Sequence, residues 1–135
     1  MERLFEVERD LREYSPGTLA FLGDCVFELL VRERLVLRGN RPVGELNREK
    51  IQMVCCKTQA KAFKMLEPCL TERETDIYKS GRNSHVSVPK NATPADYHNA
   101  TGLEALFGYL YLKGDIERIR ELYEKIDFSE IFSKG

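Results

Sequence analysis

Apolar residues recur along this chain with the period of an α-helix, and short runs of helix-ending residues separate the apolar stretches. The clearest stripe, typical of one face of an amphipathic helix, consists of Ile116, Ile119, Leu122, Tyr123 and Ile126. The signal for strands is weak, because the one alternating stretch, residues 86–88, is short and abuts Pro89. We therefore predict an all-α domain with about six helices, which lie within residues 1–13, 15–39, 42–66, 71–80, 93–113 and 116–126.

Residues that favour helix ends support these boundaries. A serine or threonine before proline begins two helices, and a Thr-x-x-Glu capping box begins a third; these signals are Ser15-Pro16, Thr93-Pro94, and Thr71 with Glu74. Glycines at positions 39 and 114 are typical of helix C-termini. The segment 81–91 has no helical pattern, and irregular segments of that length in a compact domain are often functional.

The composition indicates one globular domain, spanning residues 1–135. Hydrophobic residues make up 42% of the chain and charged residues 32%, which is enough apolar material for one core. No apolar run reaches the roughly 18 residues of a membrane span, and the N-terminus is charged from residue 2, unlike a secretory signal. We expect a cytoplasmic protein with no membrane association.

The charge is balanced, with 21 basic and 22 acidic side chains. Any attraction to nucleic acid must therefore come from local patches. The cysteines include no Cys-x-x-Cys pair, and the chain has two histidines, so we do not expect a structural zinc site. We expect the cysteines to be reduced and to lie in the core; they are Cys25, Cys55, Cys56 and Cys69.

An acidic residue lies in the middle of the most apolar predicted helix. Ten of the fourteen residues 18–31 are apolar, so we expect this helix to be buried on most sides. Asp24 lies within it, beside Gly23. A buried carboxylate is costly unless it is paired, hydrogen-bonded or bound to a metal ion, and a close helix crossing would explain the glycine. Glu28, one turn beyond Asp24, could face the same site or bind a partner helix.

A second helix repeats this arrangement. Glu104 is the only acid within residues 97–113, and Gly102 and Gly108 lie near it. If the two helices pack together, Asp24 and Glu104 meet in one site, where a divalent cation relieves the repulsion between the carboxylates. The alternative is that each acid caps a neighbouring helix or pairs with an arginine, and the spacing does not decide between these two interpretations.

Two groups of basic residues could contact a phosphate backbone. If residues 43–66 form one helix, at about 100° per residue, one face carries Lys50, Lys57, Lys61 and Lys64. The acid-free stretch 77–95 adds Lys79, Arg82, His85 and Lys90. A basic stripe and a basic loop can follow the phosphates of a nucleic acid, although many surface helices carry a solvated lysine face.

At these positions the sequence resembles the ribonuclease III family. Residues 19–29, LAFLGDCVFEL, are similar to the family's signature helix with its F-L-G-D core. Residues 101–112, TGLEALFGYLYL, are similar to its second acidic helix with its E-A-L-hydrophobic-G core, and residues 81–83 match a G-R-N stretch between them. The resemblance covers roughly residues 15–113. It is strongest to the short bacterial branch, Mini-ribonuclease III, which has the catalytic domain and no double-stranded-RNA-binding domain.

The resemblance implies a homodimeric endonuclease that cuts double-stranded RNA with Mg²⁺ and leaves 5′-phosphate and 3′-hydroxyl ends. In such an enzyme Asp24 and Glu104 are the catalytic, metal-binding carboxylates. The resemblance also implies precursor 23S ribosomal RNA as the natural substrate, and a ribosomal protein could act as a helper. We expect the contacts to the RNA backbone to come from Lys79, Arg82 and Lys90, with Lys57 and Lys61 as further candidates.

Two positions depart from the pattern of the full-length family. The chain has Ala20 where that pattern has a glutamate, and Thr101 where it has an aspartate. The short branch commonly lacks both acids, so the departure concerns the number of metal ions. Two other hypotheses remain open: a catalytically silent RNA-binding or ribosome-associated relative, and an all-α interaction module with no RNA role.

Overall fold

The computed structural model describes residues 3–84 and 87–133, and within these ranges it contains helices and no strand. The all-α prediction is therefore confirmed. Seven α-helices are described: α1 (Pro16–Leu37), α2 (Val43–Val54), α3 (Cys56–Leu66), α4 (Glu72–Arg82), α5 (Pro94–Lys113), α6 (Ile116–Glu124) and α7 (Phe128–Ser133). Two short 3-10 helices accompany them, η1 (Leu11–Glu13) and η2 (Glu67–Cys69).

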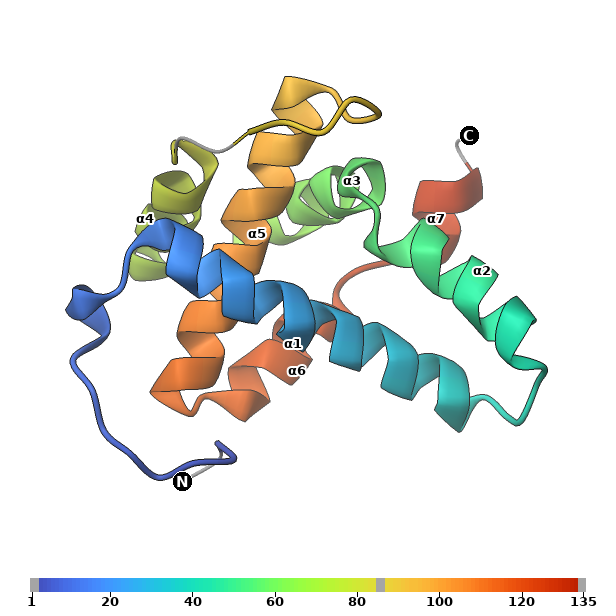
Figure 1. Ribbon diagram of the computed structural model, residues 1–135, viewed down its shortest axis with the longest axis horizontal. Coiled ribbons are helices and arrows are strands. Elements are labelled where there is room, and N and C mark those ends of the chain that lie inside the picture. Colours follow the sequence, from blue (N-terminus) through green and yellow to red (C-terminus); the bar gives the residue numbers. More distant parts are fainter. Residues whose placement is uncertain (1–2, 85–86, 134–135) are drawn as a thin grey trace.

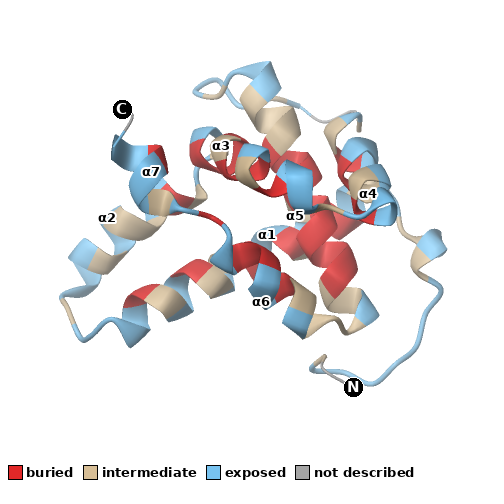
Figure 2. Ribbon diagram, turned by 180° about the vertical axis from the view of Figure 1, so that it is seen from behind, coloured by how far each residue is buried: buried red, intermediate tan, exposed pale blue. Residues whose placement is uncertain are grey.

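Helix α5 forms the centre of the molecule. Helix α1 crosses it, and α3, α4 and α6 pack around it, as Figure 1 shows. Buried residues concentrate on α5 and on the faces of the other helices that are turned toward it (Figure 2). Every residue from Ala105 to Leu110 is buried, so α5 is covered on all sides along this part, as its uniformly apolar sequence requires.

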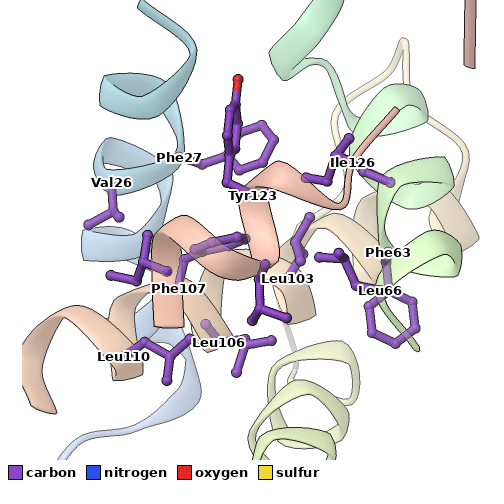
Figure 3. Packing of buried hydrophobic residues seen from close by; sticks show 14 of the residues in the cluster. Val26, Phe27, Phe63, Leu66, Leu103, Leu106, Phe107, Leu110, Tyr123 and Ile126 are labelled. Carbon is purple, nitrogen blue, oxygen red and sulfur yellow. The ribbon is translucent and has the colours of Figure 1, made fainter. Parts of the chain in front are cut away.

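Aromatic side chains join three helices in the core. Phe27 of α1 contacts Phe107 of α5 edge to face, with the ring centroids 5.7 Å apart, and it contacts Tyr123 of α6 in the same manner at 6.1 Å. Figure 3 shows these three rings together with the leucines of α5. Edge-to-face pairs add stability beyond the burial of apolar area, so the position of α1 against α5 is well defined.

The predicted helix ends are confirmed where the signal is local. The side chains of Ser15 and Thr93 accept hydrogen bonds from the backbone of the first turns of α1 and α5. Thr71 and Glu74 form the complete capping box at the start of α4. Gly114 ends α5 with φ of 84°, a left-handed conformation that favours glycine.

The structure corrects the prediction of one helix over residues 42–66. The helix is interrupted at Cys55, whose backbone is extended, so α2 ends before this residue and α3 begins after it. Two side chains of α3 stabilise the break by donating to carbonyl groups of the last turn of α2: Thr58 Oγ1 to Gln52 O at 2.6 Å, and Gln59 Nε2 to Val54 O at 3.0 Å. These bonds satisfy carbonyls that lose their helical partners.

The structure also differs from several smaller expectations. The predicted helix over residues 1–13 is reduced to η1 in the described part, α4 continues past Ser80 to Arg82, and α7 was not predicted. The cysteines do not lie in the core: Cys25, Cys55 and Cys69 are exposed and Cys56 is partly buried, although all four are free thiols, as expected.

Candidate active site at the crossing of α1 and α5

Two glycines bring the backbones of α1 and α5 into direct contact. A Cβ atom added to Gly23 would lie 1.6 Å from the backbone oxygen of Glu104, and one added to Gly108 would lie 2.0 Å from the backbone oxygen of Leu19. No other residue type fits at such distances, so the predicted close crossing at Gly23 is confirmed. The contact fixes the segment that carries Asp24 beside the one that carries Glu104.

The side chains of Asp24 and Glu104 meet at this crossing. Burial raises the pKa of Glu104 to about 8, and the negative charge of Asp24 and a hydrogen bond between the two carboxyl groups add to the shift. Neither acid caps a helix or pairs with an arginine in the described part of the chain, so the structure favours the shared site over the alternative.

The two acids differ in environment, and here the sequence interpretation of Asp24 was wrong. Asp24 is exposed, whereas Glu104 is mostly covered. Helix α1 is not buried on most sides, because Phe21 and Leu29 are 83% and 61% exposed. The cost of burying a carboxylate therefore falls on Glu104, while Asp24 faces the solvent from which a ligand would approach.

Two residues at this site were not predicted from the sequence. Gln59 Nε2 lies 3.4 Å from Glu104 Oε2. Cys56 is the second of these residues. Burial raises the pKa of its thiol, and the negative charge of Glu104 and, to a smaller extent, that of Asp96 add to the shift. The available signal for Gln59 was its helical spacing to the apolar residues Ala62, Phe63 and Leu66, which places a polar amide on a core-facing side.

The positions that lack the family acids contribute no ligand to this site. Ala20 is buried, and Thr101 is buried with its hydroxyl donating to Tyr97 O at 2.9 Å. Among the residues that the structure describes, no group of three or more histidine, cysteine, aspartate or glutamate side chains could hold a metal ion. The site thus offers two carboxylates from two helices, with a buried amide beside one of them.

The predicted cations lie on separate elements. The break at Cys55 places Lys50 on α2, where its ammonium group pairs with Glu28 at 3.0 Å. The prediction of a stripe of four lysines on one helix is therefore wrong, although Lys57, Lys61 and Lys64 remain together on α3. Of the two roles considered for Glu28, this ion pair supports the contact with another helix, which is α2 of the same chain.

The second basic group is only partly a loop. Lys79 and Arg82 lie on the last turn of α4, while Lys90 lies in the irregular segment, and His85 falls outside the described residues. The guanidinium of Arg82 lies 5.7 Å from the centre of the Tyr78 ring. None of the five cations expected to contact RNA forms an ion pair with a carboxylate in the described part of the chain: Lys57, Lys61, Lys79, Arg82 and Lys90.

Residues 17–115 match the model of the ribonuclease III domain. The chain belongs to the ribonuclease III family. Among relatives, it is 46% identical over 117 residues to Mini-ribonuclease 3 of Symbiobacterium thermophilum, a match that covers 85% of this chain and 90% of that protein. It is 40% identical over 121 residues to Mini-ribonuclease 3 of Brevibacillus brevis, covering 89% and 90% of the two proteins.

A solved structure supports the fold of this ribonuclease III family member. The crystal structure of protein FN1578 from Fusobacterium nucleatum superposes with a TM-score of 0.79 at 33% sequence identity, covering 95% of this chain and all of that one. The expected class of protein is confirmed, and the chain is an endoribonuclease. Within the described residues, no helix is long and apolar enough to cross a membrane.

Proposed function

We propose that this endoribonuclease cleaves double-stranded RNA with Mg²⁺ held by Asp24 and Glu104. The observation that carries the proposal is the meeting of the two carboxyl groups at the glycine-lined crossing of α1 and α5. The products are 5′-phosphate and 3′-hydroxyl ends, as the family resemblance implies. The relatives named Mini-ribonuclease 3 support this choice over an all-α interaction module.

The donor set fits Mg²⁺. Two adjacent carboxylates repel each other, and this repulsion contributes to the raised pKa of Glu104; a divalent cation offsets it. Magnesium is commonly bound through one or two carboxylates and keeps several waters, so a site without the acids missing at Ala20 and Thr101 is chemically sufficient. When bound, the ion polarises a phosphate oxygen and lowers the pKa of water, which is the chemistry that phosphodiester hydrolysis requires.

The protein's own contribution is to orient these groups and to hold the RNA. Asp24 is exposed and so accessible to a phosphate backbone, while most of the Glu104 side chain is covered by the surrounding protein. Double-stranded RNA is bound mainly through its shape, phosphates and 2′-hydroxyl groups. We assign the phosphate contacts to five of the cations that form no ion pair with a carboxylate, on α3, on α4 and in the segment before α5: Lys57, Lys61, Lys79, Arg82 and Lys90.

We further propose that the active form is a homodimer. At about 100° per residue, Phe21, Cys25, Leu29 and Val36 fall on one face of α1, and all four are exposed. An apolar face of this kind on a small protein marks an interaction surface. Phe21 lies about one turn before Asp24, so a second copy on this face would lie next to the candidate active site.

The most specific part of the proposal concerns the natural RNA substrate. We infer that it is precursor 23S ribosomal RNA, with a ribosomal protein as helper, because the resemblance to the short bacterial branch implies this substrate and the relatives carry that branch's name. A silent RNA-binding relative, the alternative that the sequence left open, would bind the duplex without cutting it.

A cleavage assay on a generic RNA duplex separates these functions. We expect the wild-type protein to cut the duplex when Mg²⁺ is present. Asp24→Asn should lower the single-turnover rate by more than about 100-fold, which exceeds the loss typical of residues that only orient a metal ligand. Binding of RNA should persist, because the phosphate contacts come from other residues. Glu33→Gln, an exposed acid on the same helix, is the matched control and should cleave normally.

Each outcome of the assay selects one hypothesis. Duplex binding without cleavage by the wild-type protein would favour the silent relative, and neither binding nor cleavage would favour the interaction module. Cleavage by Asp24→Asn at the wild-type rate would remove Asp24 from the site.

A further inference from the structure

A buried amide on α3 contacts the candidate active site from the protein interior. Gln59 lies in the first turn of α3 and is 1% exposed. Its Nε2 donates to Val54 O at 3.0 Å and to Glu104 Oε2 at 3.4 Å. The same amide therefore joins the end of α2 and the start of α3 to the central helix α5.

The orientation of this amide is fixed by its partners. Val54 O can only accept, so the amide nitrogen must face it, and the second hydrogen of that nitrogen is available to Glu104. Gln59 Oε1 is buried and has no hydrogen-bond partner among the described residues.

The side chains that contact the Glu104 carboxyl group in the described structure are those of Gln59 and Asp24. Asp24 is exposed, and Thr101, one turn before Glu104, bonds to its own helix. Where the full-length family pattern has four acids, this chain has two, so few side chains are left to orient the remaining carboxylates. Gln59 donates to Glu104 from the buried side, whereas Asp24 approaches it from the exposed side.

We propose that Gln59 is a positioning residue, which holds the Glu104 carboxylate in the orientation that binds the divalent ion. The inference rests on the proposed function of Asp24 and Glu104. It assigns to an amide on α3 part of the ordering that additional acids would otherwise provide. Residues that orient a metal ligand through a hydrogen bond typically change metal affinity or activity by 10- to 100-fold when they are removed.

A purely structural role for Gln59, closing the break between α2 and α3, makes a different prediction. Thr58 has that role as well, because its hydroxyl donates to Gln52 O at 2.6 Å, but no bond joins it to Glu104 in the described structure. Thr58→Val therefore removes this bond and the contact of Thr58 Oγ1 with Cys55 Sγ at 3.3 Å, and it leaves the Glu104 side chain untouched. It is the matched control for Gln59→Met, which keeps the length of the side chain and loses both donated bonds.

The test measures Mn²⁺ binding by calorimetry on the RNA-free protein, together with the Mg²⁺ concentration that gives half-maximal cleavage. We expect Gln59→Met to weaken Mn²⁺ binding by about 10- to 100-fold, to raise the half-maximal Mg²⁺ concentration by a similar factor, and to leave the KM for RNA unchanged. Thr58→Val should stay within about twofold of wild type in both ion measurements. Equal ion binding by Gln59→Met and wild type would overturn the proposal.

A measurement on the unaltered protein covers the case in which Gln59→Met fails to fold. The side-chain amide resonances of Gln59 should shift when Mg²⁺ is added, while those of Asn99, which is held by the Tyr78 hydroxyl at 2.7 Å, should not. Unchanged Gln59 resonances at saturating Mg²⁺ would also overturn the inference. If Asp24→Asn binds Mn²⁺ as tightly as wild type, the proposed metal site itself fails, a result distinguishable from failure of the Gln59 assignment.

Discussion

At the scale of single residues, the chemistry of this protein is set by one carboxyl group that is held beside another and largely away from water. Glu104 carries the burial cost, and its pKa of about 8 follows from burial first and from Asp24 second. The exposed Asp24 gives the pair its access to solvent. A site with one covered and one open acid is suited to bind a hydrated cation and a phosphate at its surface.

The raised pKa of Glu104 predicts a pH dependence of stability without divalent ions. Between the ordinary pKa of 4.5 and about 8, the folded protein retains a proton that the unfolded chain releases. The unfolded state then binds fewer protons, so the free energy of unfolding falls as pH rises through this window. Thermal melts in a chelator should show a decreasing Tm from pH 5 to pH 8.

The substitution Glu104→Gln isolates this contribution. The amide does not ionise, so the variant should lose that part of the decrease in Tm while keeping the pH dependence that arises from other groups. Identical Tm profiles for the variant and the wild type would show that Glu104 does not retain its proton in the folded protein.

At the scale of elements, the crossing of α1 and α5 positions the site. We predict that Gly23→Ala destabilises the fold, because the Cβ of the new alanine would meet the Glu104 backbone. The loss should be no less than the value typical of an overpacked core, about 1–3 kcal/mol. Cleavage should fall as well, since the helices must separate. Gly17→Ala on the same helix is the control: its Cβ meets only Ser15 Oγ, at 4.0 Å, and alanine favours helix. Denaturant melts with equal stability for both variants would contradict this account of the crossing.

The elements also show how far local sequence signals reach. The caps at Ser15, Thr71 and Thr93 act within one turn, so they could be predicted from the sequence. The break at Cys55 could not, because it depends on Thr58 and Gln59 reaching back to carbonyls of α2. Gly23 correctly indicated a close crossing, since a glycine inside an apolar helix has few other uses.

At the scale of the whole molecule, apolar content did not reveal which side of α1 is buried. The helix is apolar on two faces, one packed on α5 and one exposed around Phe21. A sequence pattern does not distinguish an internal contact from a contact with a second copy, because both remove apolar area from water. This is why Asp24 was expected to be buried, although it is exposed.

The exposed face of α1 predicts the oligomeric state. Light scattering should give twice the 15.6 kDa chain mass for the wild-type protein. Phe21→Ser should shift the protein to the monomer mass without lowering the stability of the monomer, because Phe21 is 83% exposed. Leu37→Ser, at 74% exposed and on another side of α1, should remain dimeric. A monomer mass for the wild type at assay concentration would exclude the dimer.

The most direct test of the central claim is anomalous diffraction from crystals grown with Mn²⁺. The claim is that Asp24 and Glu104 together hold the divalent ion on which RNA cleavage depends. We predict a Mn²⁺ peak at the crossing of α1 and α5, bonded to carboxylate oxygens of both residues, and no such peak in Asp24→Asn crystals grown in the same way. A wild-type map in which the ion lies elsewhere, with the two carboxyl groups still hydrogen-bonded to each other, would contradict the account.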